Sequence, residues 1–279
     1  MVGHVNDYYL SEKISAMHID YKATNKASWN ERTKIHWESD FYDNKSFLAG
    51  ANSLKDIETP LLGDLTNKSV LHLQCHFGQD TISLTRLGAT KAVGVDLSDE
   101  AVSRATELAA LCNSPATFIC CDVYDLPQYL DEQFDIVFTS YGTIGWLPDI
   151  NRWASIVAQY LKPGGKFVMA EFHPVVWMYD SDFKAITYDY FHGEPIVEQE
   201  GTYTDGAQSF ESTNVTWNHG LAEVMGSLLR QGLSIDHISE YDYSPYECFA
   251  NTKEVSPGRY RIAAIGPRIP MVYALSASK

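Results

Sequence analysis

The chain has 279 residues, of which 45% are hydrophobic and 13% aromatic, enough for one large domain or for one domain with an elaborate cap. Its 21 basic and 36 acidic residues give a net charge of −15. This excludes the basic surface with which proteins bind nucleic acid or anionic membranes. No stretch is apolar for long enough to span a bilayer, and the first residues do not resemble a signal peptide. The five cysteines form no CxxC pair, so we expect a cytoplasmic protein with reduced thiols.

The first 65 residues are polar and rich in aromatic side chains. We expect short helices here, forming an N-terminal lid segment (residues 1–65) over a neighbouring site. Ordinary packing of aromatic side chains on the flank of a domain explains the composition about equally well.

A regular alternation of strands and helices begins at residue 68. Apolar runs predict strands, and helical spacing with capping residues predicts the helices between them. The expected strands are 69–73, 92–95, 117–121, 134–138 and 166–172. Such alternation is typical of an α/β fold with a doubly wound, mostly parallel sheet covered on both faces. We assign residues 66–174 to a Rossmann-like, cofactor-binding core.

The alternation is interrupted after residue 174. Residues 175–217 contain β-prone pieces, such as 185–191 and 212–217, and are interpreted as an inserted β-rich cap. Residues 218–279 then return to the core sheet. They supply an amphipathic helix over 221–229 and strands over 233–239 and 271–275, which makes seven strands in all.

The first strand–helix turn is where a ligand is expected in such a sheet. It reads Gln74-Cys-His-Phe-Gly78 and therefore lacks the GxGxxG pattern that lets a backbone approach a pyrophosphate. A cofactor without phosphates needs less of this anion-binding backbone, so a dinucleotide is disfavoured.

Acidic residues follow the next two strands. Asp96 ends the second strand, 18 positions after Gly78, and can accept hydrogen bonds from both ribose hydroxyls of a nucleoside. The alternative, that Asp96 only caps the next helix, is less favoured because Ser98 suits that role. Leu97 can pack against an adenine face, and Asp122 with the amide of Val123 can bind the adenine edge.

Five motifs in this order resemble those of class I S-adenosylmethionine-dependent methyltransferases. They are Val70-Leu-His-Leu-Gln-Cys-His-Phe-Gly78, Val93-Gly-Val-Asp-Leu-Ser98, Cys121-Asp122, Phe134-Asp-Ile-Val137 and Leu161-Lys-Pro-Gly-Gly165. The resemblance covers about residues 45–175. The part beyond it is similar to a bacterial subgroup whose substrate is unassigned.

The resemblance implies that S-adenosylmethionine is the cofactor and which residues bind it. The turn from Gln74 to Gly78 would surround the methionine portion, and residues 139–143 would lie near the sulfonium. The full expected set is His72, Gln74, Cys75, His76, Gly78, Asp96, Leu97, Asp122, Val123, Ser140 and Tyr141.

Three positions of the first motif depart from the family. His72 stands where an acidic residue usually helps to hold the cofactor's ammonium group, and Gln74 and His76 stand in place of glycines. Histidine could accept a hydrogen bond there only in its neutral form. Either the N-terminal lid supplies a replacement carboxylate, or His72 has a structural role.

Two residues are candidates for catalysis. His173 follows the fifth strand and titrates in the range of a general base, with Glu171 on the same strand face to orient it. A histidine bonded to backbone at a strand end is the more favoured interpretation. Tyr141 could bind the substrate or support the sulfonium through its ring. His219 is interpreted as a surface or capping histidine, and no metal site is expected at His72, Cys75 and His76.

The sequence therefore predicts an S-adenosylmethionine-dependent methyltransferase that acts on a small molecule, without nucleic acid or membrane partners; a homodimer is compatible with it. A non-catalytic module that binds S-adenosylmethionine or a nucleoside is one alternative. A nicotinamide-dependent oxidoreductase is another, and the missing GxGxxG pattern speaks against it.

Overall fold

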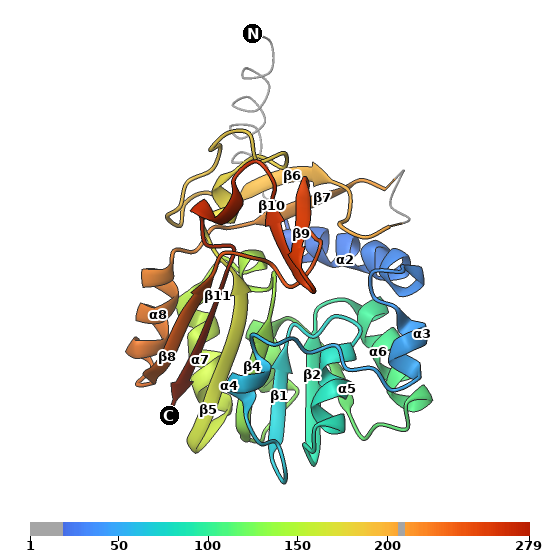
Figure 1. The fold of residues 1–279 in the computed structure, drawn as a ribbon. Helices are drawn as coiled ribbons and strands as arrows, with labels where there is room; N and C mark the ends of the chain where they lie inside the picture. Colours follow the sequence, from blue (N-terminus) through green and yellow to red (C-terminus); the bar gives the residue numbers. More distant parts are fainter. Residues whose placement is uncertain (1–18, 206–209) are drawn as a thin grey trace.

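The computed structural model describes residues 19–205 and 210–279; the rest of the expected lid segment lies outside this range. Seven strands form one sheet in the order β3-β2-β1-β4-β5-β11-β8 (Figure 1). Their bounds are β1 Ser69–Leu73, β2 Lys91–Asp96, β3 Thr117–Cys120, β4 Phe134–Ser140, β5 Leu161–Phe172, β8 Ser234–Tyr241 and β11 Val272–Ser278.

Strands β1 to β5 pair in parallel, and β11 is antiparallel to both of its neighbours, β5 and β8, so that β11 alone runs in the opposite direction. The order reverses between β1 and β4, which is where such sheets bind their ligands. The predicted doubly wound, mostly parallel seven-stranded sheet is therefore confirmed.

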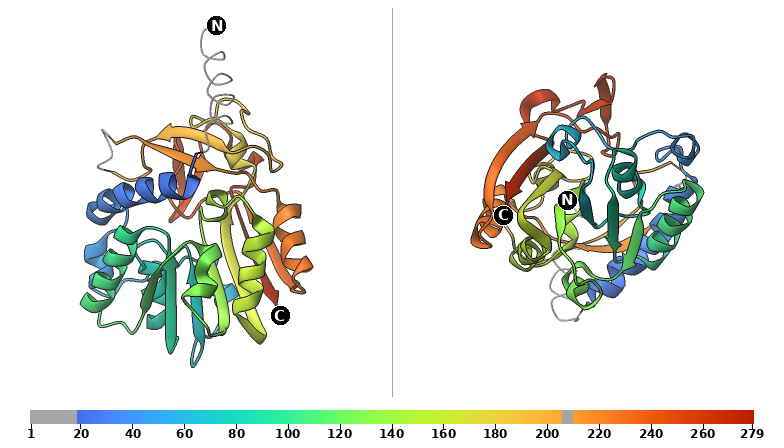
Figure 2. Two further views of the ribbon diagram at one scale, coloured as in Figure 1. Left: turned by 180° about the vertical axis from the view of Figure 1, so that it is seen from behind. Right: turned by 90° about the horizontal axis from the view of Figure 1, so that it is seen from below.

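Helices cover both faces of the sheet (Figure 2). The helices are α2 Tyr21–Glu38, α3 Asn44–Leu48, α4 Thr59–Leu62, α5 Gln79–Arg86, α6 Asp99–Leu111, α7 Ile150–Tyr160 and α8 Leu221–Arg230. Alternate strand residues enter two cores: Leu71 and Leu73 pack with the residues of α7 and α8, whereas Val70 packs with those of α5 and α6. Burial on both faces explains why these strands read as continuous apolar runs.

A second layer lies above the carboxyl ends of the parallel strands (Figure 1). It combines α2 with a hairpin of β6 (Ile196–Glu200) and β7 (Ser212–Thr216). Asn25 of α2 joins the two through its side chain, which donates to the Val215 carbonyl oxygen at 2.7 Å and accepts from the Val215 amide at 2.9 Å. Segments almost 200 positions apart in the sequence thus form one roof over the core.

The structure differs from the sequence prediction in three places. Residues 185–191 contribute only an isolated bridge, between Tyr179 and Ile186, and no strand. A hairpin of β9 (Thr252–Ser256) and β10 (Arg259–Ile262) was missed, because β9 is largely exposed and β10 has only four residues in which to show an alternation. Strand β5 begins at Leu161, five residues earlier than expected.

Among residues 19–205 and 210–279, no helix is both long and apolar enough to cross a membrane.

Candidate functional site

A cavity of about 980 Å³ lies between the sheet and this roof. Its floor is formed by the residues that follow β1, β2, β3 and β4, and its walls include residues of α2, β6 and β7. Every residue predicted to bind the cofactor lines this cavity: His72, Gln74, Cys75, His76, Gly78, Asp96, Leu97, Asp122, Val123, Ser140 and Tyr141.

The turn after β1 keeps the backbone conformation of a glycine-rich loop without the glycines. Gln74 and His76 both adopt positive φ angles, of 56° and 50°. Residues other than glycine rarely occupy this region. The Cys75 amide donates to the Val95 carbonyl oxygen and the His76 amide to Asp96 Oδ2, which fixes the turn. At Gly78 a Cβ atom would lie 2.6 Å from the Phe118 ring, so this glycine is required.

Asp96 ends β2 and is held in place by backbone amides. Its carboxylate accepts from the amides of His76 at 2.8 Å and Ser98 at 2.9 Å. Burial raises the pKa of Asp96 to about 6, although these hydrogen bonds act in the opposite direction. The Ser98 side chain caps α6 by accepting from the Ala101 amide, as expected from the sequence.

Asp122 connects the floor of the cavity to the roof. Its Oδ1 accepts from the Tyr124 amide at 2.8 Å, and its Oδ2 lies 2.8 Å from the ammonium nitrogen of Lys22 on α2. Helix α2 therefore covers the part of the cavity where an adenine edge was expected.

His72 belongs to a chain of hydrogen bonds that ends on a carboxylate. Its Nε2 lies 3.3 Å from Ser140 Oγ, which donates to Asp80 Oδ2 at 3.0 Å. Because the hydroxyl hydrogen of Ser140 is directed to Asp80, His72 Nε2 carries a hydrogen and Nδ1 accepts from Thr81 Oγ1. Burial lowers the pKa of His72 to about 4, so the ring is neutral at pH 7.

Asp80 thus supplies a carboxylate to this part of the cavity. It comes from the first turn of α5, two residues after Gly78, and the lid segment contributes Ser53, whose hydroxyl donates to Asp80 Oδ1 at 2.6 Å. The sequence left open whether the lid supplies a replacement carboxylate or His72 has a structural role. The nearest signal in the sequence was the position of Asp80 beside the glycine turn.

The lid does supply a second carboxylate, Glu58, which lies behind Tyr141. The Tyr141 hydroxyl donates to Glu58 Oε2 at 2.6 Å, and Glu58 is fully buried. Burial, followed by repulsion from Asp80, raises the pKa of Glu58 to about 7. No motif signals Glu58, because its role depends on the folding of the lid against β4.

Glu171 does not orient His173 as the sequence suggested. Its carboxylate instead accepts from the amides of Gly142, Thr143 and Ile144, and so fixes the turn that carries Tyr141. Tyr141 itself has a φ of 38°. Glu171 therefore positions the turn after β4.

His173 lies outside the cavity lining. Its Nε2 lies 2.8 Å from Glu240 Oε1, and its Nδ1 accepts from the Val175 amide at 3.2 Å. Both ring nitrogens are thus engaged at the junction of β5 and β8. The bond to Val175 matches the interpretation that the sequence favoured, a histidine bonded to backbone at a strand end, and His173 does not face the cavity as a general base for the acceptor would.

A pair of histidines joins the turn after β1 to the roof. His36 Nδ1 of α2 lies 2.9 Å from His76 Nε2, and His36 Nε2 lies 2.5 Å from Thr202 Oγ1. Burial lowers the pKa of His36 to about 2 and that of His76 to about 3, so both rings are neutral. The side chain at position 76 thus provides a hydrogen bond to the lid that a glycine could not.

Known structures with this fold include three methyltransferases. A putative S-adenosylmethionine-dependent methyltransferase from Listeria monocytogenes has 20% identity and a TM-score of 0.56, over 79% of this chain and 94% of the other. An S-adenosylmethionine-dependent methyltransferase from Clostridium acetobutylicum has 16% identity and a TM-score of 0.55, over 88% of this chain and 94% of the other. An S-adenosylmethionine-dependent methyltransferase from Mesorhizobium loti has 22% identity and a TM-score of 0.52, over 83% of this chain and 100% of the other. No curated protein sequence matches the chain.

Residues 70–165 match the profile of a family described as "Methyltransferase domain". These residues run from β1 into β5 and include the turns that line the cavity floor. This match agrees with the resemblance carried by the five motifs, and the sheet has the same fold as the three methyltransferase structures.

Proposed function

We propose that this protein is an S-adenosylmethionine-dependent methyltransferase that acts on a small molecule. The observation that carries the proposal is the cavity of about 980 Å³, which holds Asp96, Asp122 and Asp80 along one floor under the roof of α2 and β6–β7. Ligand cavities span roughly 300–1,000 Å³, so this one has room for a cofactor and a small acceptor together. A roof of this kind favours a small acceptor over a macromolecular one.

The residues of the floor fit this cofactor. The amide nitrogen of Gln74 donates to the Thr143 carbonyl oxygen, which fixes the orientation of the side chain. Its Oε1 atom is buried and has no hydrogen-bond partner in the described part of the chain. Together with the Asp80 carboxylate it offers acceptors to an ammonium group. Asp96 would bind the ribose hydroxyls, Leu97 the adenine face, and Asp122 with Val123 the adenine edge.

S-adenosylmethionine supplies an electrophilic methyl group when it is bound. The remaining task of the protein is to orient the acceptor and, for an oxygen or nitrogen acceptor, to remove its proton. Tyr141 lines the cavity and Glu58 lies behind it. The Tyr141 hydroxyl can pass its hydrogen to Glu58 Oε2 while it receives the acceptor's proton. Glu58, with a pKa of about 7, is a suitable final base.

One observation supports the alternative of a non-catalytic binding module. Gln74 and His76 place side chains where the family has glycines, and the His76 ring contacts Tyr42 and Phe77 within the cavity lining. The two functions differ in one outcome: a binding module takes up the cofactor but transfers no methyl group to any acceptor.

Isothermal titration with S-adenosylmethionine tests the proposal, followed by methyl transfer from labelled cofactor to a panel of metabolites. We expect saturable binding and transfer to at least one acceptor. No detectable heat at millimolar cofactor would refute it, and binding without transfer would favour the binding module. Fluorescence enhancement of reduced nicotinamide would favour an oxidoreductase instead.

We also propose a cytoplasmic location. All five cysteines are free thiols in the structure, which is the state expected in a reducing compartment. Two expectations remain predictions from the sequence. One is that nucleic acid and membranes are not partners, and the other is that a homodimer is compatible with the chain.

A further inference from the structure

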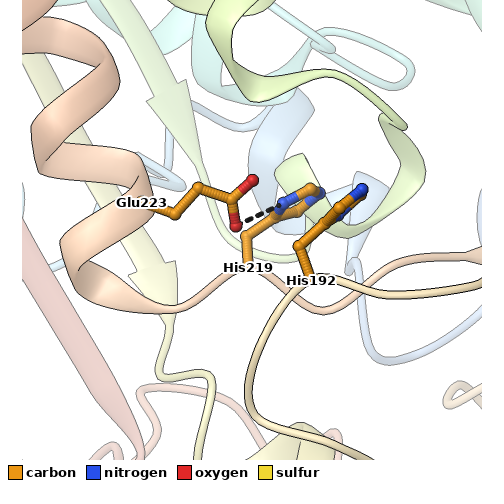
Figure 3. Close-up of side chains that lie close together, drawn as sticks. All are labelled: His192, His219 and Glu223. Carbon is orange, nitrogen blue, oxygen red and sulfur yellow. Dashed lines mark hydrogen bonds and ion pairs between the residues drawn. The ribbon is translucent and has the colours of Figure 1, made fainter.

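Two histidines and a glutamate come together at the amino-terminal end of α8, outside the cavity lining (Figure 3). His219 precedes the helix and is buried, so it is not the surface or capping histidine that the sequence predicted. Glu223 lies in the first turn of α8, and His192 comes from the inserted segment before β6. One ligand atom of each residue lies within 4.8 Å of those of the other two. The rings of His192 and His219 are nearly parallel, with centroids 5.0 Å apart.

The hydrogen bonds of His219 leave one nitrogen facing a carboxylate. His219 Nε2 lies 2.8 Å from the Leu147 carbonyl oxygen, which can only accept, so this nitrogen carries a hydrogen. In a neutral ring the lone pair of Nδ1 then points at Glu223 Oε2, 3.2 Å away. Two electron pairs in contact, on a side chain that is only 1% exposed, need a positive charge between them, which is either a proton on Nδ1 or a metal ion.

The position of His192 is set by contacts of Asp189 and Tyr190, which precede it in the inserted segment. The Asn218 side chain donates to the Asp189 carbonyl oxygen at 2.7 Å, and the Leu221 amide donates to the Tyr190 hydroxyl at 3.1 Å. The Tyr190 ring also packs so closely on Gly220 that a Cβ atom there would lie 2.6 Å from it. The exposed His192 ring therefore lies beside His219.

We propose that His192, His219 and Glu223 bind a divalent transition-metal ion, with zinc as the best match, and that this ion links the inserted segment to α8. Two imidazoles and a carboxylate are a common ligand set for zinc. In a tetrahedral site with bonds of about 2.0 Å, neighbouring ligand atoms are about 3.3 Å apart, close to the 3.2 Å between His219 Nδ1 and Glu223 Oε2. The Leu147 carbonyl fixes the tautomer of His219, as backbone carbonyls do for metal-bound histidines.

Titration of the full-length, chelator-treated protein with Zn²⁺, in competition with a chromophoric chelator, tests the proposal. We expect one ion per chain with a dissociation constant in the micromolar range or below. Co²⁺ in its place should give visible absorption bands of a tetrahedral site with nitrogen and oxygen ligands, without the thiolate charge-transfer band that the cysteines would produce.

The variants His192→Ala and Glu223→Gln should each weaken binding at least tenfold. His192 is exposed, so its loss leaves the core unchanged, and His237→Ala on β8 is the matched control with wild-type affinity. Wild-type binding by His192→Ala, or the absence of stoichiometric uptake, would overturn the proposal and leave a doubly protonated His219 paired with Glu223. Methyl transfer is not part of this readout, so failure here is separate from failure of the proposed function.

Discussion

Glu58→Gln tests the buried carboxyl behind Tyr141 through the pH dependence of stability. The ordinary pKa of this carboxyl is 4.5, and burial raises it to about 7 in the folded protein. Below pH 4.5 the carboxyl is protonated in both states and has no effect. Between these two values the unfolded chain loses the proton while the folded protein keeps it, so stability falls as pH rises.

The loss amounts to about 3 kcal/mol, since one pH unit corresponds to about 1.4 kcal/mol, and it is complete above pH 7. Glutamine has nearly the same shape and cannot ionise. The stability of Glu58→Gln relative to the wild type should therefore rise by about 3 kcal/mol between pH 4.5 and pH 8. Neutral buried histidines such as His36 and His76 contribute the opposite pH dependence, but they are common to both proteins and cancel in the difference.

Urea unfolding of both proteins at several pH values measures this difference. Glu38→Gln, at an exposed position of α2, is the matched control and should show a constant difference from the wild type. If the difference between Glu58→Gln and the wild type is also constant from pH 5 to pH 8, Glu58 is not a carboxyl with a raised pKa and is not suited to be the final base.

Four further variants test the site. Asp80→Asn should weaken binding of S-adenosylmethionine by about 1.5–3 kcal/mol in isothermal titration, whereas the exposed Asp131→Asn should not; equal affinities would remove Asp80 from the site. Asp96→Ala should weaken binding by about the same amount and lower the melting temperature, because two backbone amides lose their acceptor; unchanged affinity would refute the ribose assignment. Lys22→Met breaks a partly exposed ion pair with Asp122 and should weaken binding of S-adenosylmethionine by less than about 1 kcal/mol. Salt screens such a pair, so a loss of affinity that is larger at high salt than at low salt would contradict this expectation. Tyr141→Phe keeps the ring that lines the cavity but loses the hydroxyl, and it should lower kcat for an oxygen or nitrogen acceptor by about 10²–10⁴-fold; an unchanged kcat would exclude the proton relay.

The sequence was sufficient for the parts of the fold that depend on local patterns. Strands buried on both faces appear as apolar runs, and the caps Ser98 and Asp149 mark where α6 and α7 begin. The cofactor turn could also be located, because the carboxyl ends of β1, β2 and β4 meet at one edge of a parallel sheet. All of the residues predicted from these positions line the cavity.

Tertiary structure decided the partners of these residues. Glu58 and His36 have no signal of their own, and Asp80 has only its position beside the glycine turn. Each gains its role from a side chain far away in the sequence: Tyr141, His76 and Ser140, respectively. Strand spacing allowed Glu171 to face His173, yet its carboxylate binds the turn after β4, since unpaired amides there need acceptors. A sequence pattern records which face a residue occupies. Which group it meets on that face depends on how the lid and the inserted segment pack onto the core.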